Sequence, residues 1–309
     1  MAGSEGAPPV VRVICGPTAA GKTHAAVLCA RFADLAVVSA DSRQLYRGFD
    51  VGTAKPTARE RLVAPHYGID VLDPSERASA AWWAAQADGW LRDAIAAGRT
   101  PVVVGGTGLY LRALFGELFD EPPMDASRRA ELQAELGTLS VDELRRWVER
   151  LDPARASLGR TQLLRAVEIA LLTGRRVSEL HRERRTVPQW RARYLVVDPG
   201  PVLAGRIEAR TREMFGAGWG DEVRRLMRTV AAEAPAWNAS GYGTIREMEQ
   251  GRITHEEAVE RVVIETRQYA KRQRTWFRHQ LAGADVTRLE LHGAADVEPL
   301  RAWWEGAVA

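Results

Sequence analysis

The chain has 309 residues, 46% of them hydrophobic, which is enough for one large domain or for a core domain with a smaller one. No apolar stretch is long enough to cross a bilayer, and residues 1–9 lack the basic start and apolar centre of a signal peptide. Cys15 and Cys29 lie outside any CxxC or Cys/His cluster, which argues against a zinc site and suits a reducing cytoplasm. The net charge is only +3, but arginines gather at 182–185 and 267–278, either as solvated helix faces or as a patch for a polyanion.

Short apolar runs alternate with helical patterns in the first third of the chain. In chain order, the patterns predict a strand at 10–15, a helix at 22–32, strands at 35–39 and 69–72, a helix at 78–97 and a strand at 101–104. Strands that alternate with helices in this way indicate βαβ units and a parallel sheet.

The character of the chain changes after residue 119, where Pro122 and Pro123 interrupt it. Residues 126–182 then show only helical patterns, rich in Arg, Glu and Leu. Beyond them we expect a strand at 194–198, helices at 202–215, 220–232 and 255–280, and a late strand at 286–291. The sequence therefore predicts an α/β core formed by residues 1–120 and 190–309, with an all-helical insertion at 121–189.

A phosphate-binding loop follows the first predicted strand. Residues 16–23 fit G-x-x-x-x-G-K-[ST] at every fixed position, with a strand before them and a helix after. In such a loop the backbone N–H groups wrap phosphate oxygens, the lysine (here Lys22) adds a charge, and the hydroxyl (here Thr23) can bind Mg²⁺. The match makes the fold P-loop NTPase-like, a parallel sheet flanked by helices, and predicts a phosphate chain as ligand without identifying ATP.

Two further polar residues follow other predicted strands. Asp41 comes after the second strand, and Thr107 follows the strand at 101–104. Ligands of open α/β sheets bind outside the carboxyl ends of the strands, so both side chains should face the crevice of the phosphate loop. Asp41 could accept a proton, bind Mg²⁺ through water or cap a helix, and Thr107 could bind an acceptor base or Asp41, or simply close a turn.

Longer strings resemble the tRNA dimethylallyltransferase family. The resemblance runs from about residue 10 to residue 277 and is carried by six strings, at 16–23, 41–48, 52–56, 69–74, 105–110 and 266–276. It implies a P-loop core with a helical insertion that helps to grip the anticodon arm of tRNA. It also implies a reaction, in which N6 of adenosine 37 attacks C1 of dimethylallyl diphosphate and diphosphate leaves.

The resemblance also implies roles for individual residues. Asp41 is the expected base, with Thr107 and Lys22 as further catalytic residues, and Arg206 shares a helix face with Arg210. Diphosphate is expected at Gly16, Thr18, Ala19, Ala20, Gly21, Lys22, Thr23 and Arg210, with Mg²⁺ at Thr23. Contacts to tRNA are expected from Asp41, Ser42, Arg43, Gln44, Thr107, Arg129, Gln162, Arg165, Tyr242, Arg267, Lys271 and Arg274.

Two strings depart from the family. Residues 158–162 lack its basic Asn-Asp-x-(Arg/Gln)-Arg-like string, and Gly243 stands where the family has an arginine after Gly-Tyr. We therefore expect tRNA affinity or tRNA choice to differ from typical members.

Three rival functions remain open. A small-molecule kinase has the same phosphate loop but leaves the string at 41–56 unexplained, and an enzyme for free adenine nucleotides does not need the helical insertion. A non-catalytic RNA-binding protein has no need to keep Lys22, Thr23 and Asp41. We expect a cytoplasmic, monomeric enzyme that uses Mg²⁺, dimethylallyl diphosphate and tRNA, without a membrane or an obligate protein partner.

Overall fold

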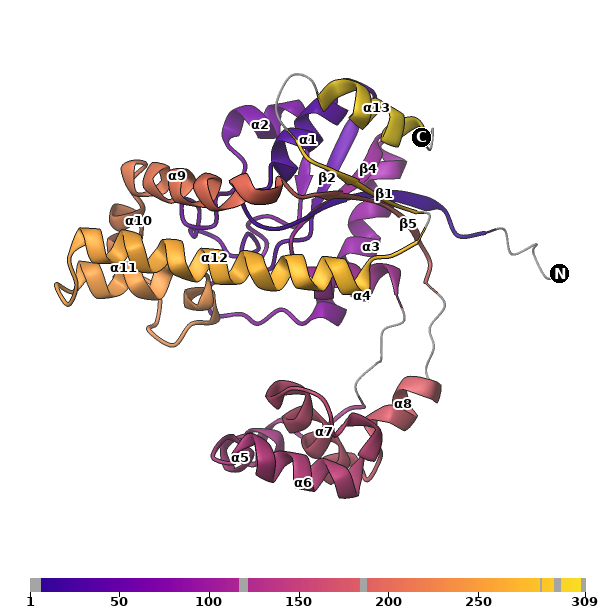
Figure 1. The fold of residues 1–309 in the computed structure, drawn as a ribbon, viewed down its shortest axis with the longest axis vertical. Coiled ribbons are helices and arrows are strands. Elements are labelled where there is room, and N and C mark those ends of the chain that lie inside the picture. The colour runs from indigo at the N-terminus through magenta and orange to yellow at the C-terminus, as the bar shows by residue number, and fades with distance from the viewer. Residues whose placement is uncertain (1–6, 117–121, 184–187, 284, 292–295, 307–309) are drawn as a thin grey trace. The chain divides into compact units, whose positions relative to one another are not determined.

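The fold is built on one parallel sheet of six strands (Figure 1). The computed structural model describes residues 7–116, 122–183, 188–283, 285–291 and 296–306. The strands are β1 (Val10–Cys15), β2 (Leu35–Ser39), β3 (His66–Tyr67), β4 (Thr100–Gly105), β5 (Arg191–Val197) and β6 (Val286–Leu289). Their order is β3-β2-β4-β1-β5-β6, and every neighbouring pair is parallel. This confirms the predicted fold class.

The predicted third strand at 69–72 is wrong. The strand in this region is β3, which ends at Tyr67, and Asp70 then has a φ of 60°, outside the range of a strand. Leu72 still forms an isolated parallel bridge with Tyr46. The apolar run resembles a strand because Ile69 and Leu72 are buried, although the backbone between them turns.

Nine helices of the described chain accompany the sheet. They are α1 (Lys22–Cys29), α2 (Ala58–Val63), α3 (Ala80–Ala96), α4 (Gly108–Phe115), α9 (Leu203–Gly216), α10 (Trp219–Leu226), α11 (Tyr242–Glu249), α12 (His255–Gln280) and α13 (Val297–Glu305). The longest, α12, has the predicted bounds and begins with a capping box between Thr254 and Glu257. Helices α1 and α10 end earlier than predicted.

The sheet is covered on both faces, which is why the central strands β2 and β4 are largely apolar. On one face, α1 and α13 pack over β1, β2, β4 and β5, with Trp303 and Trp304 of α13 in the same apolar cluster as Ile14 and Val102 (Figure 1). Helix α3 packs against β2 and β4, and its buried Trp83 donates from Nε1 to Ser39 O at 3.1 Å. The loops that follow β1, β2 and β4 are thereby held on a rigid base.

The chain divides into two compact units, residues 1–115 with 189–309 and residues 116–188. The second unit contains α5 (Ala126–Gly137), α6 (Val141–Leu151), α7 (Arg160–Thr173) and α8 (Val177–Glu183). It has its own apolar core, which includes Leu144, Val148, Leu163 and Val167. Its fully buried Asp152 accepts hydrogen bonds from the backbone and the hydroxyl of Ser178, at 2.9 and 2.6 Å. That this unit helps to bind an anticodon arm stays a prediction.

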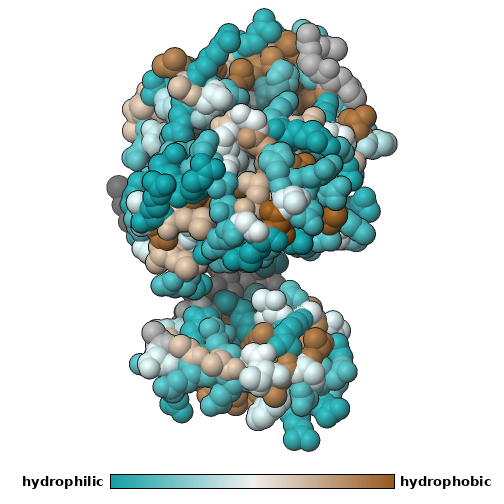
Figure 2. All heavy atoms as spheres, turned by 90° about the vertical axis from the view of Figure 1, so that its left-hand side faces the viewer, coloured by the Kyte–Doolittle hydropathy of each residue, from teal (hydrophilic) through white to brown (hydrophobic). Residues whose placement is uncertain are grey.

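Polar side chains dominate the face drawn in Figure 2, and in each unit apolar ones are scattered among them. None of the helices that the structure describes is long and apolar enough to cross a membrane. In the arginine cluster predicted at 182–185, Arg184 and Arg185 lie outside the described residues.

Candidate active site

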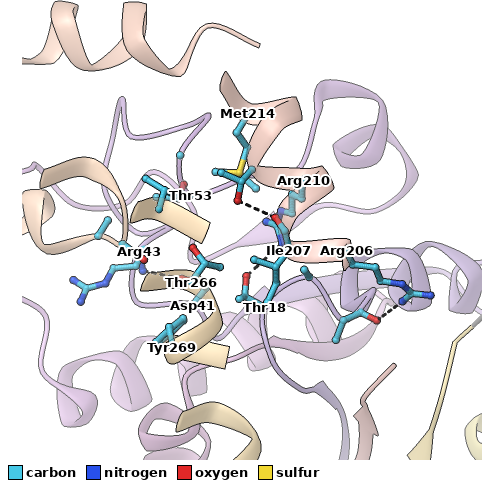
Figure 3. A pocket seen from close by; sticks show the side chains of 18 of the residues that line it. Thr18, Asp41, Arg43, Thr53, Arg206, Ile207, Arg210, Met214, Thr266 and Tyr269 are labelled. Carbon is cyan, nitrogen blue, oxygen red and sulfur yellow. Dashed lines mark hydrogen bonds between the residues drawn. The ribbon is translucent and has the colours of Figure 1, made fainter. Parts of the chain in front are cut away.

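A cavity of about 370 Å³ opens beside the carboxyl ends of β1 and β2 (Figure 3). The phosphate loop and the segment after β2 form part of its wall, and α9 and α12 form most of the rest. Because parallel strands end at one edge of a sheet, residues 18–23 and Asp41 line the same cavity, as predicted from their positions after strands. Gly16 and Thr107 are not among the residues that line it.

The phosphate loop adopts the conformation that its glycines allow. Gly16 and Gly21 have φ values of 147° and 102°, and a Cβ on Gly16 would lie 2.1 Å from Val197 O. Lys22 Nζ donates to Pro17 O at 2.7 Å, which folds the side chain back over the loop. Burial lowers the pKa of Lys22 to about 8, and Asp41 opposes this shift. An anion bound here would stabilise the charged form of Lys22.

Two arginines of α9 meet the phosphate loop in different ways. Arg210 Nη1 lies 3.4 Å from Thr18 Oγ1, and burial lowers its pKa, an effect that Asp41 and Glu213 oppose. Arg206 donates to Ala20 O and to Leu291 O, at 3.4 and 2.7 Å. Both line the cavity, but Arg206 already braces the loop against the C-terminal segment, so Arg210 is the better candidate for contacting a ligand.

Asp41 begins a run of turns rather than a helix, which removes the helix-capping alternative. Its Oδ1 accepts a hydrogen bond from Arg43 N at 2.8 Å, which fixes the carboxylate as the chain leaves β2. Thr107 Oγ1 accepts from Ser42 N at 3.1 Å, so Thr107 holds the segment that carries Asp41. Tyr269, from α12, also hydrogen-bonds to the side chain of Thr107, and burial raises the pKa of Tyr269 to about 12.

One edge of α12 supplies cavity residues that sequence reasoning missed. Thr266, Tyr269 and Gln273 recur at intervals of three and four residues and all line the cavity. Gln273 is buried, accepts from Thr18 N at 2.9 Å and donates from Nε2 to Gly106 O at 2.8 Å. It therefore ties the phosphate loop to the loop of Thr107. The sequence did contain a signal for these residues, because they form an uncharged polar edge on a helix that is otherwise strongly basic.

The predicted basic stripe of α12 is partly engaged within the protein. Arg267 Nη2 donates to Glu208 Oε2 at 3.1 Å, and Arg274 Nε donates to Asp198 Oδ1 at 3.0 Å. Lys271, in contrast, is exposed. For Arg267 and Arg274 the structure shows a bracing role, and contacts to tRNA stay a prediction.

The remaining predicted tRNA residues lie in different surroundings, each described here within its own unit. Tyr242 is fully buried and donates from its hydroxyl to Glu222 Oε1 at 2.6 Å, so its side chain belongs to the core rather than to an RNA surface. Within the helical unit, Arg129 forms an ion pair with the buried Glu168. Gln162 caps α7 by accepting a hydrogen bond from Gly159 N at 3.3 Å. Arg165 is exposed on α7. Arg43 and Gln44 do line the cavity, and Ser42 lies between Asp41 and Arg43.

Replacing Gly52 by alanine is expected to destabilise the fold by about 1–3 kcal/mol through overpacking. A Cβ on Gly52 would lie 2.2 Å from Trp219 Nε1 and 2.5 Å from Tyr242 Cε2, and both rings are buried. Urea denaturation measures the effect. Gly243→Ala is the matched control, because a Cβ there meets open space and alanine favours a helix, which predicts equal or higher stability. A Gly52→Ala protein as stable as the wild type would contradict this packing.

Comparisons with known proteins agree on one family. The IPP transferase family model matches residues 44–280, and the isopentenyl transferase model matches residues 9–64. A tRNA dimethylallyltransferase of Anaeromyxobacter sp. (strain K) is 42% identical over 274 residues, 87% of this chain and 90% of that protein. One from Deinococcus radiodurans is 39% identical over 288 residues, 91% and 93% of the two chains.

A solved structure gives the same result. The full-length tRNA isopentenylpyrophosphate transferase from Bacillus halodurans is 32% identical with a TM-score of 0.69, over 97% of this chain and 96% of that one. The resemblance stated from the sequence strings is therefore confirmed. Since a family model covers most of the chain and several relatives match almost all of it, the chain belongs to the IPP transferase family.

Proposed function

We propose that this protein transfers a dimethylallyl group from dimethylallyl diphosphate to N6 of adenosine 37 in tRNA and releases diphosphate. The observation that carries the proposal is a single cavity lined by a phosphate loop, the cations Lys22 and Arg210, and the carboxylate of Asp41. Cations suit a leaving diphosphate, and a carboxylate suits an amine that must lose a proton. The names of the relatives, tRNA dimethylallyltransferases, support the same reaction.

In the proposed reaction, the N6 lone pair forms a bond to C1 of the allyl group as the bond between C1 and the diphosphate oxygen breaks. The electron pair of that bond leaves on the diphosphate, where Lys22, Arg210 and the loop N–H groups stabilise the added charge. The N6 proton passes to Asp41. An aromatic amine is a weak nucleophile, so positioning by Thr107 and the cavity wall supplies much of the acceleration.

Mg²⁺ is the proposed cofactor, with the hydroxyl of Thr23 as its protein ligand. Among the described residues, no group of three or more His, Cys, Asp or Glu side chains is arranged to hold a metal ion. This fits a Mg²⁺ that is held mainly by substrate phosphates and water. When bound, the ion would neutralise charge on the diphosphate. The proposal is supported by Thr23 lining the cavity next to Lys22.

The acceptor is proposed to be tRNA rather than a free nucleotide. N6 of a stacked loop adenine is out of reach, so the base must be turned out of its stack to enter the cavity. Exposed Lys271, and the helical unit with Arg165, are the proposed contacts to the RNA backbone. We further propose that the enzyme is cytoplasmic, a reducing compartment in which the buried cysteines Cys15 and Cys29 stay free thiols, and that it acts as a monomer.

Affinity for dimethylallyl diphosphate is expected to fall as the pH rises above about 8. In the ligand-free site Lys22 loses its proton near that pH, and the bound diphosphate requires the charged form. Binding must then include proton uptake, which weakens it by up to about tenfold per pH unit. Calorimetric titration between pH 7 and pH 10 measures this. In Lys22→Arg the affinity should not decline with pH, since the guanidinium stays charged. If the affinity of both proteins fell equally with pH, Lys22 would not be the group responsible.

Radiolabelled dimethylallyl diphosphate tests the proposed function. The protein is incubated with Mg²⁺ and the labelled donor in three tubes, with unmodified tRNA, AMP or ATP. Label in tRNA supports the proposal. Label in AMP alone would move the protein to free nucleotides, and consumption of ATP without label transfer would favour a kinase.

A further inference from the structure

The string at 52–56 carries part of the family resemblance, yet the proposed reaction gives its lysine no part. Lysine is rare in this chain, at only three of the 43 lysine and arginine positions, namely 22, 55 and 271. Lys22 belongs to the phosphate loop and Lys271 is exposed, whereas the side chain of Lys55 is only 3% exposed. A buried ammonium in a chain that otherwise uses arginine calls for a structural reason.

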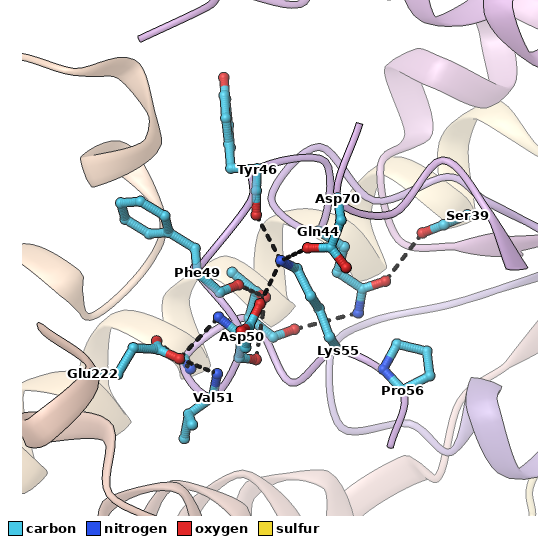
Figure 4. Close-up of polar contacts among 12 residues, drawn as sticks. Ser39, Gln44, Tyr46, Phe49, Asp50, Val51, Lys55, Pro56, Asp70 and Glu222 are labelled. Atoms are coloured by element: carbon cyan, nitrogen blue, oxygen red, sulfur yellow. Dashed lines mark hydrogen bonds and ion pairs between the residues drawn. The ribbon is translucent and has the colours of Figure 1, made fainter. Parts of the chain in front are cut away.

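Three acceptors surround the ammonium of Lys55 (Figure 4). Nζ donates to Tyr46 O at 2.6 Å, to Asp50 Oδ1 at 2.7 Å and to Asp70 Oδ1 at 2.5 Å. An ammonium has three N–H donors and no acceptor, so this arrangement uses all of them. Arg61 pairs with the second oxygen of Asp70 at 3.1 Å, which balances two carboxylates with two cations.

These contacts join the last residue of one loop to the middle of that loop and to Asp70, which lies outside it. Residues 41–55, the 41–55 loop, contain turns and the single bridge of Tyr46, without a helix or strand. Asp41, Arg43, Gln44, Gly52, Thr53 and Ala54 of this loop line the cavity. Backbone hydrogen bonds tie residues 44–47 of the loop to Asp70 and Leu72. The remainder of the loop has no helix or strand to fix it, so its shape also depends on the side chains that hold it.

Lys55 is central among those side chains. The buried Glu222 accepts hydrogen bonds from Asp50 N and Val51 N, at 2.9 and 2.7 Å (Figure 4). Gln44 Nε2 donates to Thr53 O and Ala54 O, at 3.3 and 3.2 Å. Glu222 and Gln44 each hold the part of the loop near Asp50–Ala54, whereas Lys55 also reaches Tyr46 and Asp70. Asp70 and Ala54 have positive φ values of 60° and 45°, a strain that the surrounding contacts must overcome.

We propose that Lys55 is a positioning residue, whose buried ammonium sets the shape of the 41–55 loop and so places Asp41 and Thr53 in the cavity. The expected effect of Lys55 on the reaction rate rests on the proposed function, whereas its expected effect on the shape of the loop does not. Arginine cannot replace Lys55, because a planar guanidinium with five donors does not match three acceptors grouped around one nitrogen. Lys55 is not among the residues that line the cavity, so its proposed role is to position the loop and not to contact the substrate.

Hydrogen–deuterium exchange of the ligand-free protein tests the structural claim. In Lys55→Met and Lys55→Arg, amides of the 41–55 loop should exchange at least about tenfold faster, while α1 and the sheet keep their wild-type protection. Arg59→Met, an exposed cation on α2, is the matched control and should exchange like the wild type. Wild-type protection of the loop in either Lys55 variant would overturn the proposal.

Kinetics and chemical rescue test the functional claim. Lys55→Met should lower kcat by about 10²-fold, the effect of a misplaced catalytic group, with KM for dimethylallyl diphosphate nearly unchanged. Alkylating Lys55→Cys with 2-bromoethylamine rebuilds a lysine-like ammonium, and peptide mass spectrometry establishes that position 55 is modified while the buried Cys15 and Cys29 are not. The modified protein should regain both rate and loop protection. Loss of diphosphate binding in step with the rate, or no rescue in protein that is fully alkylated at position 55, would contradict a positioning role.

Two further arms keep the test decisive. If Lys55→Met does not fold, Asp50→Ala removes one acceptor at a side chain that is 54% exposed, and should give a smaller increase confined to the same loop. If the wild type transfers no prenyl group at all, the proposed function fails, whereas the exchange measurement still decides the role of Lys55.

Discussion

Asp41→Asn should lower kcat for prenyl transfer by about 10²–10⁴-fold, the usual loss when a general base is removed. Asparagine keeps the shape of aspartate, and its carbonyl oxygen can still accept the hydrogen bond from Arg43 N that fixes the turn. What disappears is the group that takes the N6 proton. Single-turnover measurements with tRNA and labelled dimethylallyl diphosphate separate this chemical step from product release.

Asp34→Asn is the matched control for Asp41. Asp34 immediately precedes β2 and Asp41 follows its end, so the two carboxylates lie at opposite ends of one strand. The Asp34 side chain is 72% exposed, and its loss should leave the rate unchanged. If Asp41→Asn retained the wild-type rate while Asp34→Asn did too, Asp41 would not be the base.

Arg210→Met should lower kcat by about 10²–10³-fold, equivalent to about 2.7–4 kcal/mol of transition-state stabilisation. Its guanidinium lies beside Thr18 of the phosphate loop, where negative charge grows as the diphosphate leaves. Burial lowers the pKa of Arg210, so the ligand-free site holds a charge that a bound anion would stabilise. The affinity for inorganic diphosphate should fall as well, which calorimetry can measure.

Arg212→Met is the control on the same helix. Arg212 is 66% exposed and pairs with Glu208 at 3.2 Å, so removing it costs little stability and should not alter kcat. Equal rate losses for the two variants would attribute the effect to α9 as a whole rather than to charge in the cavity. An Arg210→Met protein with wild-type kcat would contradict the role in stabilising the leaving group.

The fold and the phosphate loop were predictable because local patterns determine them. The apolar runs of β1, β2 and β4 and the repeat of α12 are set by burial over short stretches, and the phosphate loop is one continuous string. Asp41 could be placed near that loop because both follow parallel strands. The strand predicted at 69–72 failed because burial of Ile69 and Leu72 does not exclude a left-handed turn at Asp70.

Other parts of the site depend on contacts between distant segments. Gln273 bonds to Thr18, 255 residues away in sequence, and Glu222 holds the backbone at Asp50 across 172 residues. The arginines of α12 looked alike in the sequence, but Arg274 faces Asp198 and Lys271 faces solvent, which only the packing of α12 decides. Likewise, the burial of Tyr242 follows from its aromatic neighbours Phe49 and Trp219.

Mass spectrometry of tRNA after reaction tests the central claim most directly. Unmodified tRNA is incubated with the enzyme, Mg²⁺ and dimethylallyl diphosphate, then digested, and a second tRNA with guanosine at position 37 serves as the control. The account predicts one added dimethylallyl group on the fragment that contains adenosine 37, absent from the control tRNA and absent with Asp41→Asn. Prenylation of AMP without modified tRNA, or ATP consumption without any prenyl transfer, would contradict it.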